Sequence, residues 1–249
     1  MKPETPQEIK FNNDFKKATF AERQAIDRNF YDRKYSIADY RRTLNIDRAF
    51  VRGIVEKYKI PRGNLLLDLG CGTGWFSNLF AELGFNVVGI DYSKTGIMNA
   101  KRLYGDKIHW IVGDVFNMPF KNKCKFDFIF CCDFPPYNLI DTPQEAISIT
   151  EKIFDHLNQN GIFIFVWSSK LTGKRMGDSV IIEYTVEQVK EIFSNTGVLI
   201  GDVFTTNKQL FPLLGQYAIS NFITKLTSFA IKLHHGNVRI ICGVKKKFG

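Results

Sequence analysis

Four aspartates of this chain stand at or just after the ends of short apolar runs, and carboxylates are the side chains best suited to accept hydrogen bonds from hydroxyl and amino groups. They are Asp68, Asp91, Asp114 and Asp133. If each apolar run is a strand of one parallel sheet, its end lies at the carboxyl edge, where open α/β sheets bind ligands. The spacing therefore predicts a polar site assembled from several strand ends.

The first aspartate belongs to the stretch N-L-L-L-D-L-G-C-G-T-G-W, residues 64–75. Its leucines suit a strand buried on both faces, and the glycines then break that strand before a helix begins. Glycines at such a turn let backbone N–H groups approach a ligand closely. The spacing G-x-G-x-G differs from the G-x-G-x-x-G of dinucleotide enzymes, and the carboxylate of Asp68 disfavours a pyrophosphate. An ammonium-bearing ligand fits better.

A second buried run, N-V-V-G-I-D, ends at Asp91, 21 residues past Gly70. Doubly wound nucleotide-binding folds place an acid at this distance, where it accepts hydrogen bonds from the ribose hydroxyls. Turn, helix, strand and acid together are far more specific than the glycine spacing alone.

The motif D-L-G-C-G-T-G resembles, letter for letter, the first motif of class I S-adenosylmethionine (SAM)-dependent methyltransferases, and the resemblance covers roughly residues 60–204 and, more weakly, the last strand. It implies a three-layer, doubly wound α/β Rossmann-like fold with a mostly parallel seven-stranded sheet, an antiparallel last strand, and SAM as cofactor. In this family the carboxylate at Asp114 accepts from the adenine amine, and the next N–H reaches a ring nitrogen. The resemblance implies these cofactor-binding residues: Asp68, Gly70, Cys71, Gly72, Gly74, Asp91, Tyr92, Asp114, Val115 and Cys131.

The fourth apolar run, F-D-F-I-F-C-C, leads into D-F-P-P-Y-N, residues 133–138. This resembles the D/N-P-P-Y/F motif of amino methyltransferases, except that Phe134 separates Asp133 from the prolines. The alternative is that the prolines only rigidify a loop. Asp133 is the candidate catalytic residue, as a base for a hydroxyl or a holder for an amine, and Tyr137 is a candidate acceptor contact.

Flanking segments are expected to cover the site. Residues 1–60 form an N-terminal helical cap, which in the resembling family closes over the cofactor, although it also suits a helical layer packed on the sheet edge; residues 61–249 form the methyltransferase domain. The loop 168–184 is a candidate acceptor cover or a solvated basic loop. A helical insertion at 205–236 is a second candidate cover, although its apolar stripe also suits core packing or a membrane surface. Candidate acceptor-binding residues in these segments are Tyr31, Tyr35, Lys170 and Phe222.

Composition bounds the partners. The net charge of +9 is spread along the chain, which favours general solubility over a nucleic-acid surface. The odd number of cysteines, five, includes no C-x-x-C spacing, and no His/Asp/Glu cluster has ligand spacing, so neither a disulfide framework nor a metal is expected. No signal-like or ~18-residue apolar run occurs, so we expect a cytoplasmic protein.

The leading interpretation is methyl transfer from SAM to an oxygen or nitrogen atom of a small molecule. Two alternatives stay open at this stage. One is an RNA or protein methyltransferase, favoured by the net charge and the near P-P-Y motif, and the other is a SAM-binding subunit without catalysis.

Overall fold

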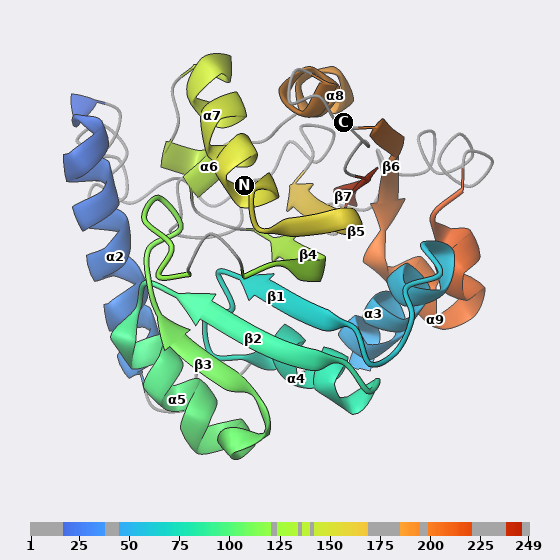
Figure 1. Ribbon diagram of the computed structural model, residues 1–249, viewed down its shortest axis with the longest axis horizontal. Coiled ribbons are helices and arrows are strands. Elements are labelled where there is room, and N and C mark those ends of the chain that lie inside the picture. Colours follow the sequence, from blue (N-terminus) through green and yellow to red (C-terminus); the bar gives the residue numbers. More distant parts are fainter. Residues whose placement is uncertain are drawn as a thin grey trace, which may run out of the picture.

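The computed structural model describes residues 17–37, 45–120, 124–133, 136–139, 142–168, 185–194, 199–220 and 238–245. In these ranges the chain forms a twisted sheet covered by helices on both faces (Figure 1). The strands are β1 Leu65–Leu69, β2 Asn86–Asp91, β3 His109–Val112, β4 Phe126–Cys132, β5 Leu157–Ser168, β6 Leu199–Asn207 and β7 Val238–Lys245. The longer helices are α2 Phe20–Ser36, α3 Asn45–Lys57, α4 Trp75–Glu82, α5 Lys94–Tyr104, α7 Pro143–Phe154 and α8 Val186–Ser194. Short helical turns are η1 Gly105–Lys107, α6 Pro136–Leu139, η3 Lys208–Leu210, α9 Phe211–Leu214 and η4 Gly215–Ala218.

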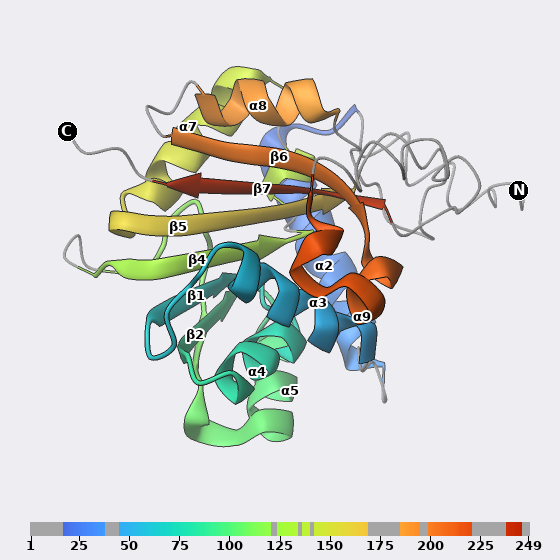
Figure 2. The same cartoon turned by 90° about the vertical axis from the view of Figure 1, so that its right-hand side faces the viewer.

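The sheet has the strand order β3-β2-β1-β4-β5-β7-β6. Pairing is parallel from β3 to β5, whereas β7 pairs antiparallel with both β5 and β6. Figure 2 shows β4, β5, β7 and β6 side by side as successive strands of this sheet. The doubly wound α/β fold expected from the sequence is confirmed. From β1 the chain builds the sheet outward to β2 and β3 on one side, and then continues with β4 and β5 on the other side. The switch point between β1 and β4 is where sheets of this kind bind ligands.

Two apolar cores fill the space between the sheet and its helices. On one face α7 and α8 pack through Ile149, Ile153 and Phe193, and on the other α3 and α4 pack through Phe50 and Phe80. The strand β1, with the sequence LLLDL, is buried along nearly its whole length because both of its faces are covered.

Local signals place several helix ends correctly. Thr142 and Glu145 form a capping box at the start of α7, and the Ser93 side chain caps α5 by accepting from the Gly96 N–H. Thr185 and Gln188 likewise exchange hydrogen bonds at the start of α8.

Two boundaries differ from the sequence expectation. The segment after Thr142 predicts a helix through Leu157, yet α7 ends at Phe154 and β5 already begins at Leu157. Strand β6 continues to Asn207, so the first residues of the expected insertion at 205–236 pair with β7. Strand pairing with a neighbour decides these limits, which local propensity does not report. Residues 221–236 of that insertion, with Phe222, lie outside the described part of the chain.

Helix α2 stands beyond the carboxyl ends of β2 and β3 (Figure 1). It is a polar helix whose start is fixed by a capping box between Thr19 and Glu22. Its position brings the N-terminal region directly over the strand ends that carry the aspartates.

Candidate functional site

The glycine-rich turn follows β1 as predicted. Gly70, Gly72 and Gly74 all have positive φ angles, of 70°, 55° and 82°, which only glycine adopts at little cost. The N–H groups of Gly70 and Cys71 both donate to the Ile90 carbonyl, at 2.9 and 3.1 Å. The turn is thereby tied to the end of β2 rather than left as an independent loop.

Asp91 fixes this turn from the end of β2. Its Oδ2 accepts from the Gly72 N–H and its Oδ1 from the Ser93 N–H, each at 2.8 Å. Burial raises the pKa of Asp91 to about 6, against the opposing effect of these two hydrogen bonds. Each carboxylate oxygen has a second lone pair, so the side chain retains acceptor capacity for a ligand hydroxyl while it holds the turn.

The third strand adds a second acid. Asp114 follows β3, and its Oδ1 accepts from the Phe116 N–H at 2.9 Å. Its Oδ2 lies 3.7 Å from Arg28 of α2. Val115 is buried beside it. The Asp114 carboxylate beside the apolar Val115 side chain suits an aromatic base that carries an amino group.

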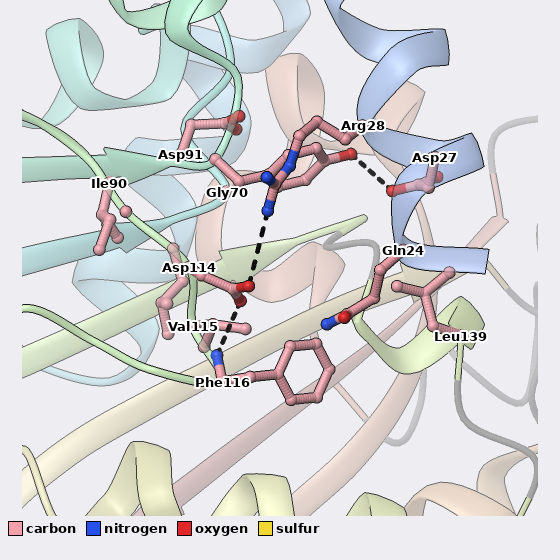
Figure 3. A pocket seen from close by; sticks show the side chains of 13 residues that line it. Gln24, Asp27, Arg28, Gly70, Ile90, Asp91, Asp114, Val115, Phe116 and Leu139 are labelled. Carbon is pink, nitrogen blue, oxygen red and sulfur yellow. Dashed lines mark hydrogen bonds and ion pairs between the residues drawn. The ribbon is translucent and has the colours of Figure 1, made fainter. Parts of the chain in front are cut away.

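A pocket connects these strand ends, with about 400 Å³ of empty space that includes open solvent at its mouth. Figure 3 shows Gln24 and Arg28 of α2 on one side, with Asp91 and Asp114 on the other. Its lining residues are Gln24, Asp27, Arg28, Leu69, Gly70, Ile90, Asp91, Tyr92, Gly113, Asp114, Val115, Phe116 and Leu139. Of the predicted cofactor residues, Gly70 of the glycine turn, Asp91, Tyr92, Asp114 and Val115 therefore line one cavity, whereas Gly72 and Gly74 do not line it.

Helix α2 is held over this pocket by hydrogen bonds to the segment after β2. The Tyr92 hydroxyl donates to Asp27 at 2.5 Å, the Ser93 hydroxyl to Asp32 at 2.5 Å, and the Asn99 amide to the Tyr35 carbonyl at 2.7 Å. Burial raises the pKa of Asp27 to about 7, partly offset by the bond from Tyr92.

The sequence did not predict the pocket residues Gln24, Asp27, Arg28, Leu69, Ile90, Gly113, Phe116 and Leu139. For the α2 residues the reason is that this helix has almost no apolar periodicity, so its inward face carries no sequence signal. Phe116 follows the predicted Asp114–Val115 pair directly and was the one that a longer reading of that loop could have found.

Tyr35 seats α2 directly on the glycine turn. A Cβ placed on Gly72 would lie 2.6 Å from the Tyr35 hydroxyl oxygen, and one on Gly96 would lie 2.9 Å from the Tyr35 ring. Both glycines therefore leave the room that this ring occupies. Tyr31 packs against Tyr35 with ring centroids 5.6 Å apart and meets Tyr92 edge-on. The two tyrosines expected to contact the acceptor thus lie at the junction of α2 and the turn.

Other predicted cofactor residues do not line this pocket. Asp68 is buried behind the turn, where its Oδ2 accepts from the Ser77 hydroxyl at 2.6 Å. Burial raises the pKa of Asp68 to about 7, with the Ser77 bond opposing. Cys71 is buried within the turn, and Cys131 is fully buried in the core on the α7 face.

The predicted acceptor residue Tyr137 is also part of the core. It is fully buried, packs edge-on against Phe165 at 5.1 Å, and its hydroxyl lies 3.0 Å from the Thr150 hydroxyl. Lys170 and Phe222 lie outside the described residues.

Asp133 stands at the end of β4 with φ 51°, a left-handed conformation that aspartate tolerates better than most residues. Its N–H donates to the Val166 carbonyl at 3.0 Å, which ties it to β5. The side chain is half-buried at the carboxyl edge of the sheet.

Among the described residues no group of three or more His, Cys, Asp or Glu side chains has the geometry of a metal site. Within the same part of the chain, no helix has the length and apolar character to span a bilayer.

Comparison with known proteins agrees with this geometry. Residues 66–161 match the family model of a methyltransferase domain. The matched part of the chain resembles the class I SAM-dependent methyltransferases. The matched range of the methyltransferase domain runs from β1 into β5 and so contains the glycine turn, Asp91 and Asp114.

Its relatives match over part of their length. A carboxy-S-adenosyl-L-methionine synthase of Campylobacter curvus is 28% identical over 141 residues, 54% of this chain and 57% of that protein. A ubiquinone biosynthesis O-methyltransferase of Pelagibacter ubique is 34% identical over 133 residues, 51% of this chain and 48% of that protein. The chain thus spans about half the length of the curated relatives it matches.

Solved structures share the fold across nearly the whole chain. The N-methyltransferase NodS of Bradyrhizobium japonicum, in complex with S-adenosyl-L-homocysteine (SAH), has a TM-score of 0.61 and 13% identity, covering 88% of this chain and 98% of that one.

SAM is the cofactor of this family, and the pocket fits its adenosine half. The ribose carries two vicinal hydroxyls and adenine one amino group, and the pocket presents carboxylates at Asp91 and Asp114 beside the apolar side chains of Ile90, Val115 and Leu139. Gly70, with its φ of 70°, lines the same space and has no side chain to fill it.

Proposed function

We propose that this chain transfers the methyl group of SAM to an oxygen or nitrogen atom of a small-molecule acceptor. The observation that carries the proposal is the pocket at the carboxyl ends of β1, β2 and β3, where the glycine turn, Asp91 and Asp114 meet under α2. In this assignment Asp91 accepts from the ribose hydroxyls and Asp114 from the adenine amine. The Val115 N–H serves a ring nitrogen.

When bound, SAM supplies a methyl group attached to a positively charged sulfur. The acceptor lone pair forms the new bond to the methyl carbon, and the sulfur leaves with the electron pair of the carbon–sulfur bond. The protein's task is to align the acceptor with that methyl group and to exclude water, which is worth on the order of 7–11 kcal/mol at best. No covalent intermediate with the protein is required, and we propose that the transfer uses no metal.

Asp133 is proposed as the catalytic residue. It lies at the end of β4, next to the sheet reversal, and its N–H bond to Val166 fixes its backbone. For a hydroxyl acceptor its carboxylate takes the proton, and for a neutral amine it accepts an N–H bond that orients the lone pair. The unusual φ of 51° is the kind of local strain that accumulates at functional positions.

Residues 1–60 are proposed to act as the lid over the cofactor. Three hydrogen bonds and the Tyr35 ring hold α2 on the segment after β2, and in this proposal these contacts open when the cofactor exchanges. When α2 moves away, the polar groups of these contacts can form hydrogen bonds with water instead. This suits a segment that opens and closes.

A small-molecule acceptor is supported by the curated relatives. The ubiquinone biosynthesis O-methyltransferase is named for a small lipid quinone pathway. A solved neighbour of the same fold is a magnesium protoporphyrin IX methyltransferase of Synechocystis, with a TM-score of 0.60 at 15% identity.

The test is a screen of small-molecule acceptors with SAM labelled on its methyl carbon. We expect label transfer to at least one hydroxyl or amine acceptor, and loss of turnover by about a hundredfold in Asp133→Asn with SAM affinity unchanged. Asparagine tolerates the same φ, so this variant changes the charge and leaves the backbone. SAM binding without transfer to any acceptor contradicts the catalytic proposal and favours the role of a SAM-binding subunit.

A further inference from the structure

A lysine and an aspartate are buried together between α3 and the segment that follows β6. Lys208 Nζ lies 3.4 Å from Asp47 Oδ1, with the two side chains 6% and 0% exposed. The ammonium also lies over the rings of Phe50, at 4.4 Å, and Phe76, at 5.2 Å. In Figures 1 and 2 α3 and α9, the helix directly after this lysine's turn, lie side by side.

Such a pair is an inefficient way to stabilise a fold. Removing two charges from water costs several kcal/mol for each ion, and well-packed apolar residues often do as well or better in the same place. The best-attested use of buried ionic groups is to fix one arrangement among several. The question is then which arrangement this pair fixes.

The second oxygen of Asp47 answers that question. The Trp75 indole N–H donates to Asp47 Oδ2 at 3.1 Å. Trp75 is the first residue of α4 and follows Gly74, the last glycine of the turn, directly. One buried carboxylate therefore links Lys208, far away in sequence, to the residue that ends the glycine-rich turn.

A second contact from α3 holds the same indole. The Arg48 guanidinium lies 5.4 Å from the centroid of the Trp75 ring and pairs with Glu82 at the other end of α4. Helix α4 is thus attached to α3 at both ends. Of these two contacts, the hydrogen bond to Asp47 is the one that orients Trp75, the first residue of α4.

The turn has little freedom once Trp75 is placed. Gly74 has φ 82°, its N–H donates to the Cys71 carbonyl at 2.9 Å, and its carbonyl accepts from the Asn78 N–H at 2.9 Å. Rotation of the Trp75 backbone would pull on both bonds. None of Asp47, Lys208 and Trp75 lines the pocket.

We propose that Lys208, Asp47 and Trp75 form a positioning relay through which the segment after β6, residues 208–219, holds the glycine-rich turn in its cofactor-binding conformation. The ammonium orients the carboxylate, the carboxylate holds the indole by a charge-assisted hydrogen bond, and the indole fixes Gly74. These are positioning residues that act on SAM affinity without touching SAM. The inference rests on the proposed cofactor site.

The relay is tested with Lys208→Met, which keeps much of the side-chain length and removes the ammonium. The full chain is titrated with SAM by calorimetry, and the three indole N–H resonances are recorded by NMR, with Trp75 assigned from Trp75→Phe. We expect SAM binding about tenfold weaker, equivalent to the loss of about one charge-assisted hydrogen bond, and a displaced Trp75 indole resonance. Lys190→Met, an exposed lysine on α8, is the matched control and leaves both readouts unchanged.

A neutral pair separates positioning from folding. Asp47→Asn alone weakens SAM binding about tenfold, while Asp47→Asn with Lys208→Met recovers to within about threefold of the wild type, because an amide oxygen still accepts from Trp75 and no buried charge remains. The double variant therefore decides the matter even if Lys208→Met fails to fold. The relay is wrong if folded Lys208→Met, or Asp47→Asn, binds SAM within twofold of the wild type with the indole resonance unmoved.

The two readouts also keep this inference apart from the cofactor site itself. A wild-type chain that does not bind SAM contradicts the proposed function. The displacement of the Trp75 resonance in Lys208→Met still tests the linkage of the three side chains in that case.

Discussion

Replacing Asp91 with alanine should damage both the fold and the cofactor site, by amounts that the structure allows to be separated. The carboxylate accepts from the N–H groups of Gly72 and Ser93 at 2.8 Å each, in a buried position. An orphaned buried N–H costs about 1–3 kcal/mol, so we expect a loss of about 2–4 kcal/mol in the free energy of unfolding, after allowing for relief of the desolvated charge. Loss of the charge-assisted contact with the ribose weakens the free energy of SAM binding by about 1.5–3 kcal/mol, which raises Kd by a factor of about 10–150.

The assay is calorimetric titration with SAM and with its demethylated product SAH, below the melting temperature found by circular dichroism. Both ligands share the ribose, so both should bind with similar affinity to the wild type and weaken together in Asp91→Ala. Asp106→Ala is the matched control, because Asp106 is exposed and only pairs with Lys101 at 2.9 Å. It should change stability by no more than about 0.5 kcal/mol. A folded Asp91→Ala protein that binds SAM as the wild type does would refute the assignment of this pocket.

Three further expectations follow from the same geometry. Gly72→Ala should weaken SAM binding and cost about 1–3 kcal/mol of stability, because its φ of 55° is strained for alanine and its Cβ would lie 2.6 Å from the Tyr35 hydroxyl oxygen; Gly63→Ala, with φ 82° and open space around it, is the control that keeps the strain but not the clash. The pKa of the Asp68 carboxyl is raised from 3.8 to about 7, so the native state binds the carboxyl proton more tightly than the unfolded state does. The contribution of this group to the free energy of unfolding is therefore largest below pH 4. It falls by up to about 4 kcal/mol as the pH rises from 4 through 7. Urea unfolding at pH 5 and pH 8 should show this fall, and Asp68→Asn should flatten it; an unchanged slope in that variant contradicts the assignment. Finally, if the acceptor is a small molecule, retention of tRNA should be weak and should vanish as salt reaches physiological strength, whereas a tight complex that persists there would favour an RNA acceptor.

The sequence predicted those parts of the molecule whose information is local. Strand β4 has the predicted limits, Phe126–Cys132, since an unbroken apolar run between polar segments specifies a buried strand on its own. The glycine turn was equally legible, because positive φ angles in succession require glycine whatever surrounds them. Asp91 and Asp114 followed from their places at strand ends, and the parallel pairing of β1, β2 and β3 brings them into one pocket.

Only the tertiary structure decided which side chains face one another across long separations in sequence. Nothing in the polar helix α2 marks Asp27 or Arg28 as pocket residues, because their inward orientation comes from docking and not from periodicity. The motif predicted Tyr137 as an acceptor contact, yet its side chain is fully buried in the core against Phe165. The pairing of Lys208 with Asp47 joins segments 161 residues apart. Local patterns encode backbone conformation and burial, whereas partners of this kind are fixed by the packing of the whole chain.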